Sequence, residues 1–362
     1  MSIVALEERL AALPVDARGA AARIYDVRTA TGRLVPPEAM LPWIEKQFGS
    51  VDAVREQRIV RVTDRVLLEG ALFNELRSRR PIAVPAQSAA DVAATIAASA
   101  PDPFCDVLAG TPADTFGRIS GAGATTAANV AKYDGAHAVL VFSAHDPLVA
   151  FDAAAIAAHF ATARRWAEAA VAADPEARYW FLLWNCLWRG GGSIVHGHMQ
   201  MTATRGMHYP KVERLRQATV SYAAAHGRDY LEDVWRVHEA LGLGVTVGPA
   251  RVFATLTPVK EREVVVLGPR GGSEADLAAG VAHALATLRG LGVLAHDLGL
   301  FLPPLRPDGA DWSRFAPVAR LVDRGDPGSR TCDIGSMELY AASVIAADPF
   351  VVAAALRGLG AR

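Results

Sequence analysis

The sequence predicts an α+β protein made of two related halves, with two antiparallel sheets flanked by helices. Three observations favour this class. The order strand, helix, strand, turn, strand occupies residues 137–205, and a similar order returns after residue 240. With 362 residues, the chain is also longer than most chains that fold around a single hydrophobic core. We therefore expect a duplicated fold.

The half between residues 101 and 210 has the clearer pattern. HAVLVFS at 137–143 is largely apolar and predicts a strand, and YWFLLWNCLW at 179–188 predicts a second, largely buried one. Between them, residues 151–174 have the apolar spacing of a long amphipathic helix. GGSIVHGHMQMTATR at 191–205 then predicts a turn and a third strand.

The half between residues 211 and 362 is expected to be a diverged copy of the first. VTVGPARVFATLTPV at 245–259 predicts a hairpin that turns at Gly248 and Pro249. The other expected elements are a strand over 261–268, a helix over 274–292, extended segments over 293–305 and 332–345, and a closing helix with Asp348 as its cap and Pro349 in its first turn. The paired histidines occur only in the first half, so we expect that half to be the active one.

Residues 1–100 predict an N-terminal arm and a helical segment that pack on the core. Arginine becomes dense near the end of this region, in LFNELRSRRP. Arg77 and Arg80 either end a solvated helix, where cations suit the helix dipole, or reach a phosphate group. The sequence leaves both interpretations open.

Charge and composition exclude several classes of partner. The chain has 37 Lys and Arg against 38 Asp and Glu, so its formal net charge of −1 gives no general attraction to nucleic acid or to an anionic membrane. Its three cysteines lie far apart, which argues against a disulfide framework. The sequence shows neither a signal peptide nor an apolar run long enough to cross a membrane. We expect a soluble, cytoplasmic protein, and a homodimer is one assembly open to it.

The stretch GGSIVHGHMQ indicates the chemistry. Side chains alternate between the faces of a strand, so His196, His198 and Gln200 are expected to share one surface. A neutral imidazole has a free lone pair and suits nucleophilic catalysis. The amide of Gln200 can only exchange hydrogen bonds and cannot supply an acid. This combination favours transfer of a phosphate-linked group over hydrolysis.

The turn before these residues predicts where a phosphate binds. Gly191 and Gly192 let the backbone approach a ligand closely and expose its N–H donors, and Ser193 adds a hydroxyl donor. We therefore expect a phosphate cradle beside the histidines.

This block resembles that of the histidine triad superfamily, in its galactose-1-phosphate uridylyltransferase-like branch of nucleotidylyltransferases and phosphorylases. The family's block runs from an asparagine through a glycine-containing turn and a serine to H-P-H-x-Q. The residues that match its spacing are Asn185, Gly191, Ser193, His196, His198 and Gln200. The resemblance implies a duplicated histidine-triad-like fold. It also implies that His198 is the nucleophile and that Gln200, Ser193 and Asn185 contact phosphates.

Several family members hold a structural zinc ion with two cysteines of C-x-x-C, a later histidine and the first histidine of the pair. Cys105, His145 and His196 match three of these ligands, whereas Leu108 stands at the position counted for the second cysteine. A tetrahedral site needs four donors. The resemblance therefore implies a degenerate zinc site unless Asp106 or another group completes it. Without a metal, His196 would support the nucleophile through hydrogen bonds, and no other cofactor is implied.

The leading hypothesis is a nucleotidylyltransferase that moves a nucleoside monophosphate between a nucleotide sugar and a sugar phosphate through a covalent intermediate on His198. One alternative is a phosphorylase of dinucleoside polyphosphates or nucleotide sugars, with inorganic phosphate as acceptor. Another is an inactive relative that only binds a nucleotide. The expected partners are a nucleotide sugar or dinucleotide and a phosphorylated small molecule. Gly197, where uridylyltransferases usually have proline, leaves the base and the sugar open.

Overall fold

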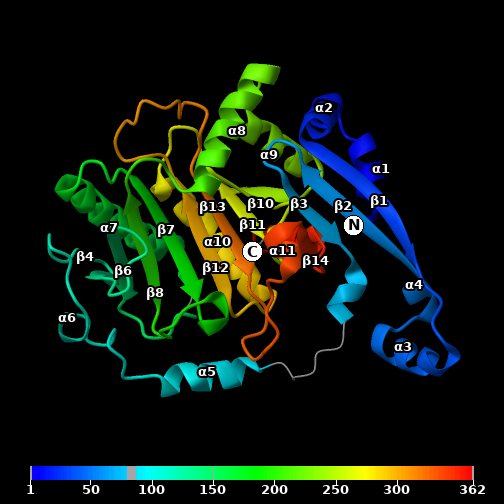
Figure 1. The fold of residues 1–362 in the computed structure, drawn as a ribbon, viewed down its shortest axis with the longest axis horizontal. Coiled ribbons are helices and arrows are strands. Elements are labelled where there is room, and N and C mark those ends of the chain that lie inside the picture. Colours follow the sequence, from blue (N-terminus) through cyan, green and yellow to red (C-terminus); the bar gives the residue numbers. More distant parts are fainter. Residues whose placement is uncertain (1, 80–86, 150, 361–362) are drawn as a thin grey trace.

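The computed structural model describes residues 2–79, 87–149 and 151–360, which form a mixed α and β fold with two sheets (Figure 1). A ten-stranded sheet runs through the molecule, and a four-stranded sheet lies beside it next to the N-terminal helices. Helices flank both sheets, so the expected α+β class is confirmed.

The ten-stranded sheet shows the duplication. Its strands follow the order β4-β5-β6-β8-β7-β12-β13-β11-β10-β9. Counted from each outer edge inwards, the five strands of each half occur in the same chain order, and the long helix of each half follows its third strand. The two halves therefore share one topology and join edge to edge, so one continuous sheet contains both.

Most strands of the two halves and their long helices lie close to the expected positions, but the strands over 120–121, 124–128 and 318–323 were not expected. The first half contains β4 (Ser120–Gly121), β5 (Ala124–Ala128), β6 (Ala136–Phe142), α7 (Ala153–Ala173), β7 (Tyr179–Cys186) and β8 (His198–Thr204). The second contains β9 (Gly244–Val247), β10 (Ala250–Ala254), β11 (Val264–Leu267), α10 (Ala278–Gly290), β12 (His296–Phe301) and β13 (Val318–Asp323). Every neighbouring pair is antiparallel, and the halves join where β7 pairs with β12, with Asn185 opposite Asp297.

The four-stranded sheet departs from the expected antiparallel arrangement. Its members are β1 (Tyr25–Arg33), β2 (Glu56–Asp64), β3 (Glu69–Phe73) and β14 (Ser343–Ile345). The first three pair antiparallel, but β14 comes from the far end of the chain and lies parallel to β3. The region 332–345, expected to be extended throughout, also holds the short helix α11 (Ser336–Tyr340). The Glu338 carboxylate caps that helix by accepting the Gly335 N–H at 2.8 Å.

The remaining helices are α1 (Leu6–Ala11), α2 (Val15–Ile24), α3 (Leu41–Phe48), α4 (Val51–Arg55), α5 (Ala89–Ala98), α6 (Val107–Gly110), α8 (Pro210–His226), α9 (Tyr230–Ala240) and α12 (Pro349–Gly360). Helices α7 and α10 pack against each other and contact strands of their own halves. Trp166 of α7 and Trp180 and Trp184 of β7 are fully buried in this layer. Among the described residues, no helix combines the length and the apolar character needed to cross a membrane.

A buried ion cluster ties the four-stranded sheet to the second half. Arg320 of β13 pairs with Glu263 at 2.5 Å and with Glu69 of β3 at 3.0 Å. Arg214 of α8 also reaches Glu69, at 2.5 Å. Buried charges are tolerated only when they are paired. These ion pairs therefore hold β3 of the four-stranded sheet against both β13 and α8.

A second buried carboxylate holds the N-terminal helices in place. Asp233 of α9 is 1% exposed and accepts hydrogen bonds from Arg23 of α2 and from Tyr222 of α8, each at 2.7 Å. Arg228 and Arg236 also pair with it. Burial alone would raise the pKa of Asp233, but the hydrogen bonds from Arg23 and Tyr222 and the nearby cations lower it overall.

We expect Asp233→Asn to lower the free energy of unfolding by about 2–3 kcal/mol at pH 7, because a neutral amide leaves the surrounding guanidinium groups without their counter-charge. The pKa of the folded carboxyl is lowered, so its stabilisation is present above the unfolded pKa and is lost as the pH falls. Urea denaturation at several pH values measures both effects. Asp52→Asn, on a side chain that is 89% exposed, is the control and should change stability by less than about 0.5 kcal/mol. Equal losses in the two variants would contradict the role of Asp233.

Candidate functional site

Strand β8 supplies two polar side chains to one surface. The strand begins at His198, and the methionines that alternate with His198 and Gln200 are fully buried in the core. His198 and Gln200 therefore lie on the other face of the sheet. His196 precedes the strand, and its Nδ1 lies 3.7 Å from the sulfur of Cys105. The strand itself carries His198 and Gln200, whereas His196 lies just before it on the same side, because Phe104 packs against the rings of both histidines.

The ring of His198 is oriented by a backbone group. Its Nδ1–H donates to the carbonyl of His196 at 2.8 Å, which leaves the lone pair on Nε2. That Nε2 has no hydrogen-bond partner among the described residues, and the residue remains 6% exposed. Burial lowers the pKa of His198, so the ring is neutral at pH 7. Phe104 packs edge-on against the ring, with 5.1 Å between centroids. The arrangement presents an oriented, nucleophilic nitrogen.

The amide of Gln200 is held on one side only. Its Oε1 lies 3.0 Å from Nε2 of His137, whereas its nitrogen contacts no hydrogen-bond partner in the described parts of the chain. Asn185 of β7 lies on the same face, because it is two residues beyond Leu183, which pairs directly with Gln200. Its half-buried side chain also lacks a hydrogen-bond partner within the described residues. Two amides thus offer free donors on the face of the sheet that carries His198.

The turn between β7 and β8 uses its amides differently from the expectation. Gly191, at φ 94°, donates its N–H to the Trp188 carbonyl at 3.1 Å, and Gly192 donates to the Leu187 carbonyl at 3.0 Å. These N–H groups are therefore occupied within the turn, which corrects the expected cradle. Ser193 is exposed, and its N–H and hydroxyl are without partners in the described residues. The free donors of the turn begin one residue later than expected.

Gly197 is required by its surroundings. A Cβ at this position would lie 2.7 Å from the Phe142 ring and 3.2 Å from the Ala144 carbonyl oxygen. The Gly197 N–H also donates to the His145 carbonyl at 3.0 Å. Proline would lose this bond and collide with both neighbours. The packing of this chain thus explains why proline is absent between the two histidines.

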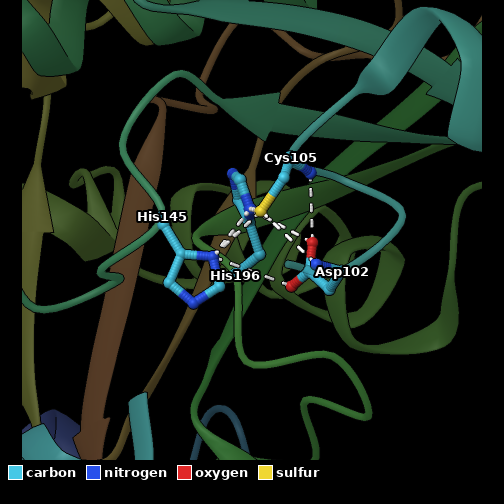
Figure 2. A group of neighbouring side chains, drawn as sticks. All are labelled: Asp102, Cys105, His145 and His196. Carbon is cyan, nitrogen blue, oxygen red and sulfur yellow. Dashed lines mark hydrogen bonds and ion pairs between the residues drawn. The ribbon is translucent and has the colours of Figure 1, made fainter. Parts of the chain in front are cut away.

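Four side chains near His198 converge on one point, and Figure 2 shows them facing one another. They are Asp102, Cys105, His145 and His196, and their donor atoms all lie within 4.8 Å of one another. The two Nδ1 atoms of the histidines are 3.2 Å apart. The sulfur of Cys105 is 3.4 Å from the Nδ1 of His145. Three separate segments of the chain meet here, before α6, after β6 and before β8.

The cluster fits a bound cation. The Nε2–H of His145 donates to the Ile96 carbonyl at 3.0 Å, and that of His196 donates to the Phe142 carbonyl at 2.8 Å. Both Nδ1 atoms therefore carry lone pairs, which repel each other unless a cation lies between them. The Oδ2 of Asp102 is buried without a hydrogen-bond partner among the described residues. Two imidazole nitrogens, a thiolate and a carboxylate oxygen form a donor set that suits tetrahedral zinc.

The fourth donor lies on the opposite side of Cys105 from the one expected. Leu108 is 72% exposed, and Asp106 caps α6 by accepting the Ala109 N–H at 3.1 Å, so neither belongs to the cluster. Asp102 stands three residues before Cys105 and accepts its N–H at 3.1 Å. The signal in the sequence was the spacing D-x-x-C, in which a carboxylate replaces the first cysteine of C-x-x-C.

A polar cleft opens next to the β7–β8 turn. Arg189 belongs to the single-turn helix η4 (Trp188–Gly190) of that turn and lines the cleft. The other cations that line it are Arg77, Lys260 and Arg324. Arg77 thus faces a polar cleft, whereas Arg80 lies outside the described residues. Arg324 bonds to Asp297 and Asp333, and burial raises the pKa of Asp297 to about 6 despite this cation. Five carboxylates also line the cleft, and one of them, Asp333, lies 3.6 Å from Arg189, so the lining is mixed in charge.

No protein-family model matches the sequence, and no curated protein matches it significantly. Solved structures do match. An ADP-glucose phosphorylase from Arabidopsis thaliana with bound ADP-glucose aligns with a TM-score of 0.61 at 15% identity, over 82% of this chain and 96% of that one. A galT-like protein from the same plant gives a TM-score of 0.61 at 15% identity, over 82% and 97%. A uridylyltransferase structure gives a TM-score of 0.52 at 18% identity, over 62% and 74%.

The chain shares its fold with these phosphorylase, galT-like and uridylyltransferase structures. The resemblance drawn from the spacing of residues 185–200 is thus confirmed at the level of the fold. Within this fold, the candidate nucleophile His198 begins β8, the strand next to β7, through which the two halves join.

Metal content tests the four-residue cluster. We infer that the purified protein holds about one zinc ion per chain. Cys105→Ser should lower the zinc content several-fold after dialysis, because a hydroxyl is a poor zinc ligand. Cys332→Ser replaces another exposed cysteine, outside the cluster, and should leave the content unchanged. Inductively coupled plasma mass spectrometry measures the zinc. The same content in both variants would refute the assignment of Cys105.

Proposed function

We propose that the protein is a nucleotidyltransferase that carries a nucleoside monophosphate on His198. The observation that carries this proposal is the unbonded Nε2 of His198 on the same strand face as the unbonded amide nitrogen of Gln200. The shared fold with a uridylyltransferase and an ADP-glucose phosphorylase supports the same class of reaction.

The reaction proceeds as two displacements at one phosphorus atom. The Nε2 of His198 attacks the α-phosphorus of a nucleotide sugar, a P–N bond forms, and the bond to the bridging oxygen breaks. The sugar phosphate leaves with that electron pair and needs no acid. An oxygen of a second phosphate then attacks the same phosphorus, and the breaking P–N bond returns its electrons to Nε2. The His196 carbonyl accepts the Nδ1–H throughout, which stabilises the positive ring of the intermediate.

Donors around the nucleophile bind the transferred phosphate. The amide nitrogen of Gln200 donates to a non-bridging oxygen, and Asn185 and the Ser193 hydroxyl are available for its neighbours. The cluster of Asp102, Cys105, His145 and His196 would hold the zinc ion, whose contribution is structural. The chain's own role there is to orient His196, whose carbonyl orients the nucleophile.

The acceptor in the leading form of the proposal is a sugar phosphate, and Arg77 in the polar cleft is a cation that could bind it, whereas Arg189 is paired with Asp333. Inorganic phosphate is the second candidate, which the fold shared with an ADP-glucose phosphorylase favours. A protein that only binds nucleotide is the alternative of another class. The oriented, neutral His198 argues against it, because binding alone does not require a free nucleophile.

Covalent labelling tests the nucleophile. Incubation with ADP-glucose or UDP-glucose labelled at the α-phosphorus should leave an acid-labile label on the wild type and none on His198→Ala. The exchange rate should fall by about 10³-fold or more in that variant. His226→Ala removes an exposed histidine at the end of α8 and should keep both label and rate. A label that persists on His198→Ala would refute this nucleophile.

Product analysis separates the two acceptors. The labelled protein is offered glucose 1-phosphate or inorganic phosphate in turn, and released nucleotide products are resolved by chromatography. A sugar-phosphate acceptor yields a nucleotide sugar, whereas phosphate yields a nucleoside diphosphate. The transferase form of the proposal fails if only inorganic phosphate removes the label.

A further inference from the structure

A third buried histidine lies beside the candidate site, on strand β6. His137 is 0% exposed and stands directly opposite Thr202 in the pairing of β6 with β8. Its Nε2 is 3.0 Å from the Oε1 of Gln200. A buried imidazole needs partners for both nitrogens. His137 is neither the nucleophile nor part of the four-residue cluster, so its position calls for another explanation.

The protonation of His137 follows from its surroundings. Its Nδ1 accepts the backbone N–H of Tyr133 at 2.9 Å. A ring nitrogen that accepts a hydrogen bond carries no proton, so the proton of the neutral ring is on Nε2. Burial lowers the pKa of His137, in keeping with a neutral ring. The Nε2–H must therefore donate. Two side chains lie near it, the Gln200 oxygen at 3.0 Å and the Asn129 amide nitrogen at 3.3 Å. An amide nitrogen cannot accept, and the Asn129 oxygen already accepts the Ala131 N–H, so the Gln200 oxygen is the acceptor among the described residues.

The loop between β5 and β6 holds the ring of His137 in place. Tyr133 stacks on it, with ring centroids 4.3 Å apart and planes at 26°. The His137 carbonyl accepts the Asn129 N–H at 3.0 Å and the Lys132 ammonium at 2.9 Å. One short loop thus fixes both the ring and the backbone of His137, so the donor of the hydrogen bond to Gln200 is held in a defined position.

The same loop is tied to β8 from a second side. The hydroxyl of Tyr209 lies 3.1 Å from both Asp134 of the loop and Thr202 of β8. The loop, the strand and the start of α8 are therefore linked around the pair of His137 and Gln200. If the Gln200 amide turned over, its oxygen would lose the hydrogen bond to His137. Among the described residues, no other donor lies within hydrogen-bond distance of that amide.

We propose that His137 is a positioning residue, which holds the Gln200 oxygen and so turns the Gln200 amide nitrogen toward the transferred phosphate. This inference rests on the proposed function. In the opposite orientation, the amide would present its oxygen to the phosphate oxygens, which also carry negative charge and cannot donate. His137 thus decides whether Gln200 attracts or repels the phosphoryl group, although it does not touch the substrate itself.

Two substitutions separate the donor from the rest of the ring. In His137→Gln the longer amide can place a donor near the position of Nε2, whereas in His137→Asn the shorter amide reaches only the position of Nδ1. We expect kcat for nucleotide exchange to fall about tenfold or more in His137→Asn, with KM changed less than about threefold. His137→Gln should remain within about threefold of the wild type. Equal losses in the two variants, at unchanged zinc content and melting temperature, would overturn the proposal.

A double-mutant cycle tests whether His137 acts through Gln200. Gln200→Ala should reduce exchange strongly in the wild type and only slightly in the His137→Asn background, because that amide is no longer oriented. Independent, multiplicative losses would overturn the role of His137 in an active enzyme.

Nuclear magnetic resonance of the substrate-free wild type keeps this inference distinct from the proposed function. Long-range ¹⁵N–¹H correlations should show the His137 proton on Nε2, and the Gln200 amide signals should shift in His137→Asn. A proton on Nδ1 would overturn the role of His137, even if both variants failed to fold. Absence of label and exchange from the wild type would instead overturn the proposed function, whatever the tautomer.

Discussion

The site depends on one backbone joint, the pairing of residues 142–145 with residues 196–198. The Phe142 N–H donates to the Gly197 carbonyl at 2.9 Å, and the Gly197 N–H donates to the His145 carbonyl at 3.0 Å. The Phe142 carbonyl also accepts from the ring of His196, and the His196 carbonyl accepts from the ring of His198. One short crossing of two chain segments therefore aligns the four-residue cluster and His198, the proposed nucleophile. A metal bound to the cluster would stabilise the contact between these two segments, and the reaction itself would remain with His198.

Backbone groups also set the two functional orientations. The ring of His198 is turned by a carbonyl, and the amide of Gln200 is turned by His137, whose tautomer is set by the Tyr133 N–H. Backbone amides and carbonyls neither ionise nor change rotamer. The orientations of His198 and Gln200 are thus both fixed, directly or through His137, by backbone groups that cannot change their own protonation or rotamer.

Local patterns in the sequence predicted most strands of the ten-stranded sheet, the helices α7 and α10, and the pair formed by His198 and Gln200, because these depend on periodicity and short spacing. Strands β4, β5 and β13 and the helices α8 and α9 were not predicted. Features that depend on contacts between distant segments were missed. Asp102 became a candidate ligand only when three segments met at the cluster. The pairing of β3 with β14 and the contact of His137 with Gln200 join residues 63 or more positions apart. The Gly191 amide was misassigned because the turn, with Leu187 at φ 65°, satisfies its own donors.

Because the two halves share one topology, Arg320 of the buried ion cluster can be compared with the residue at the same strand position in the first half. Arg320 is the third residue of β13, as Gln200 is the third residue of β8, and each contacts a side chain from the neighbouring strand region, Glu263 or His137. In the first half this position keeps free donors. In the second half its guanidinium is used to anchor Glu69 of the N-terminal sheet. The half that lacks the paired histidines thus holds the N-terminal arm in place, so equivalent strand positions belong to the candidate site in one half and to the assembly of the chain in the other.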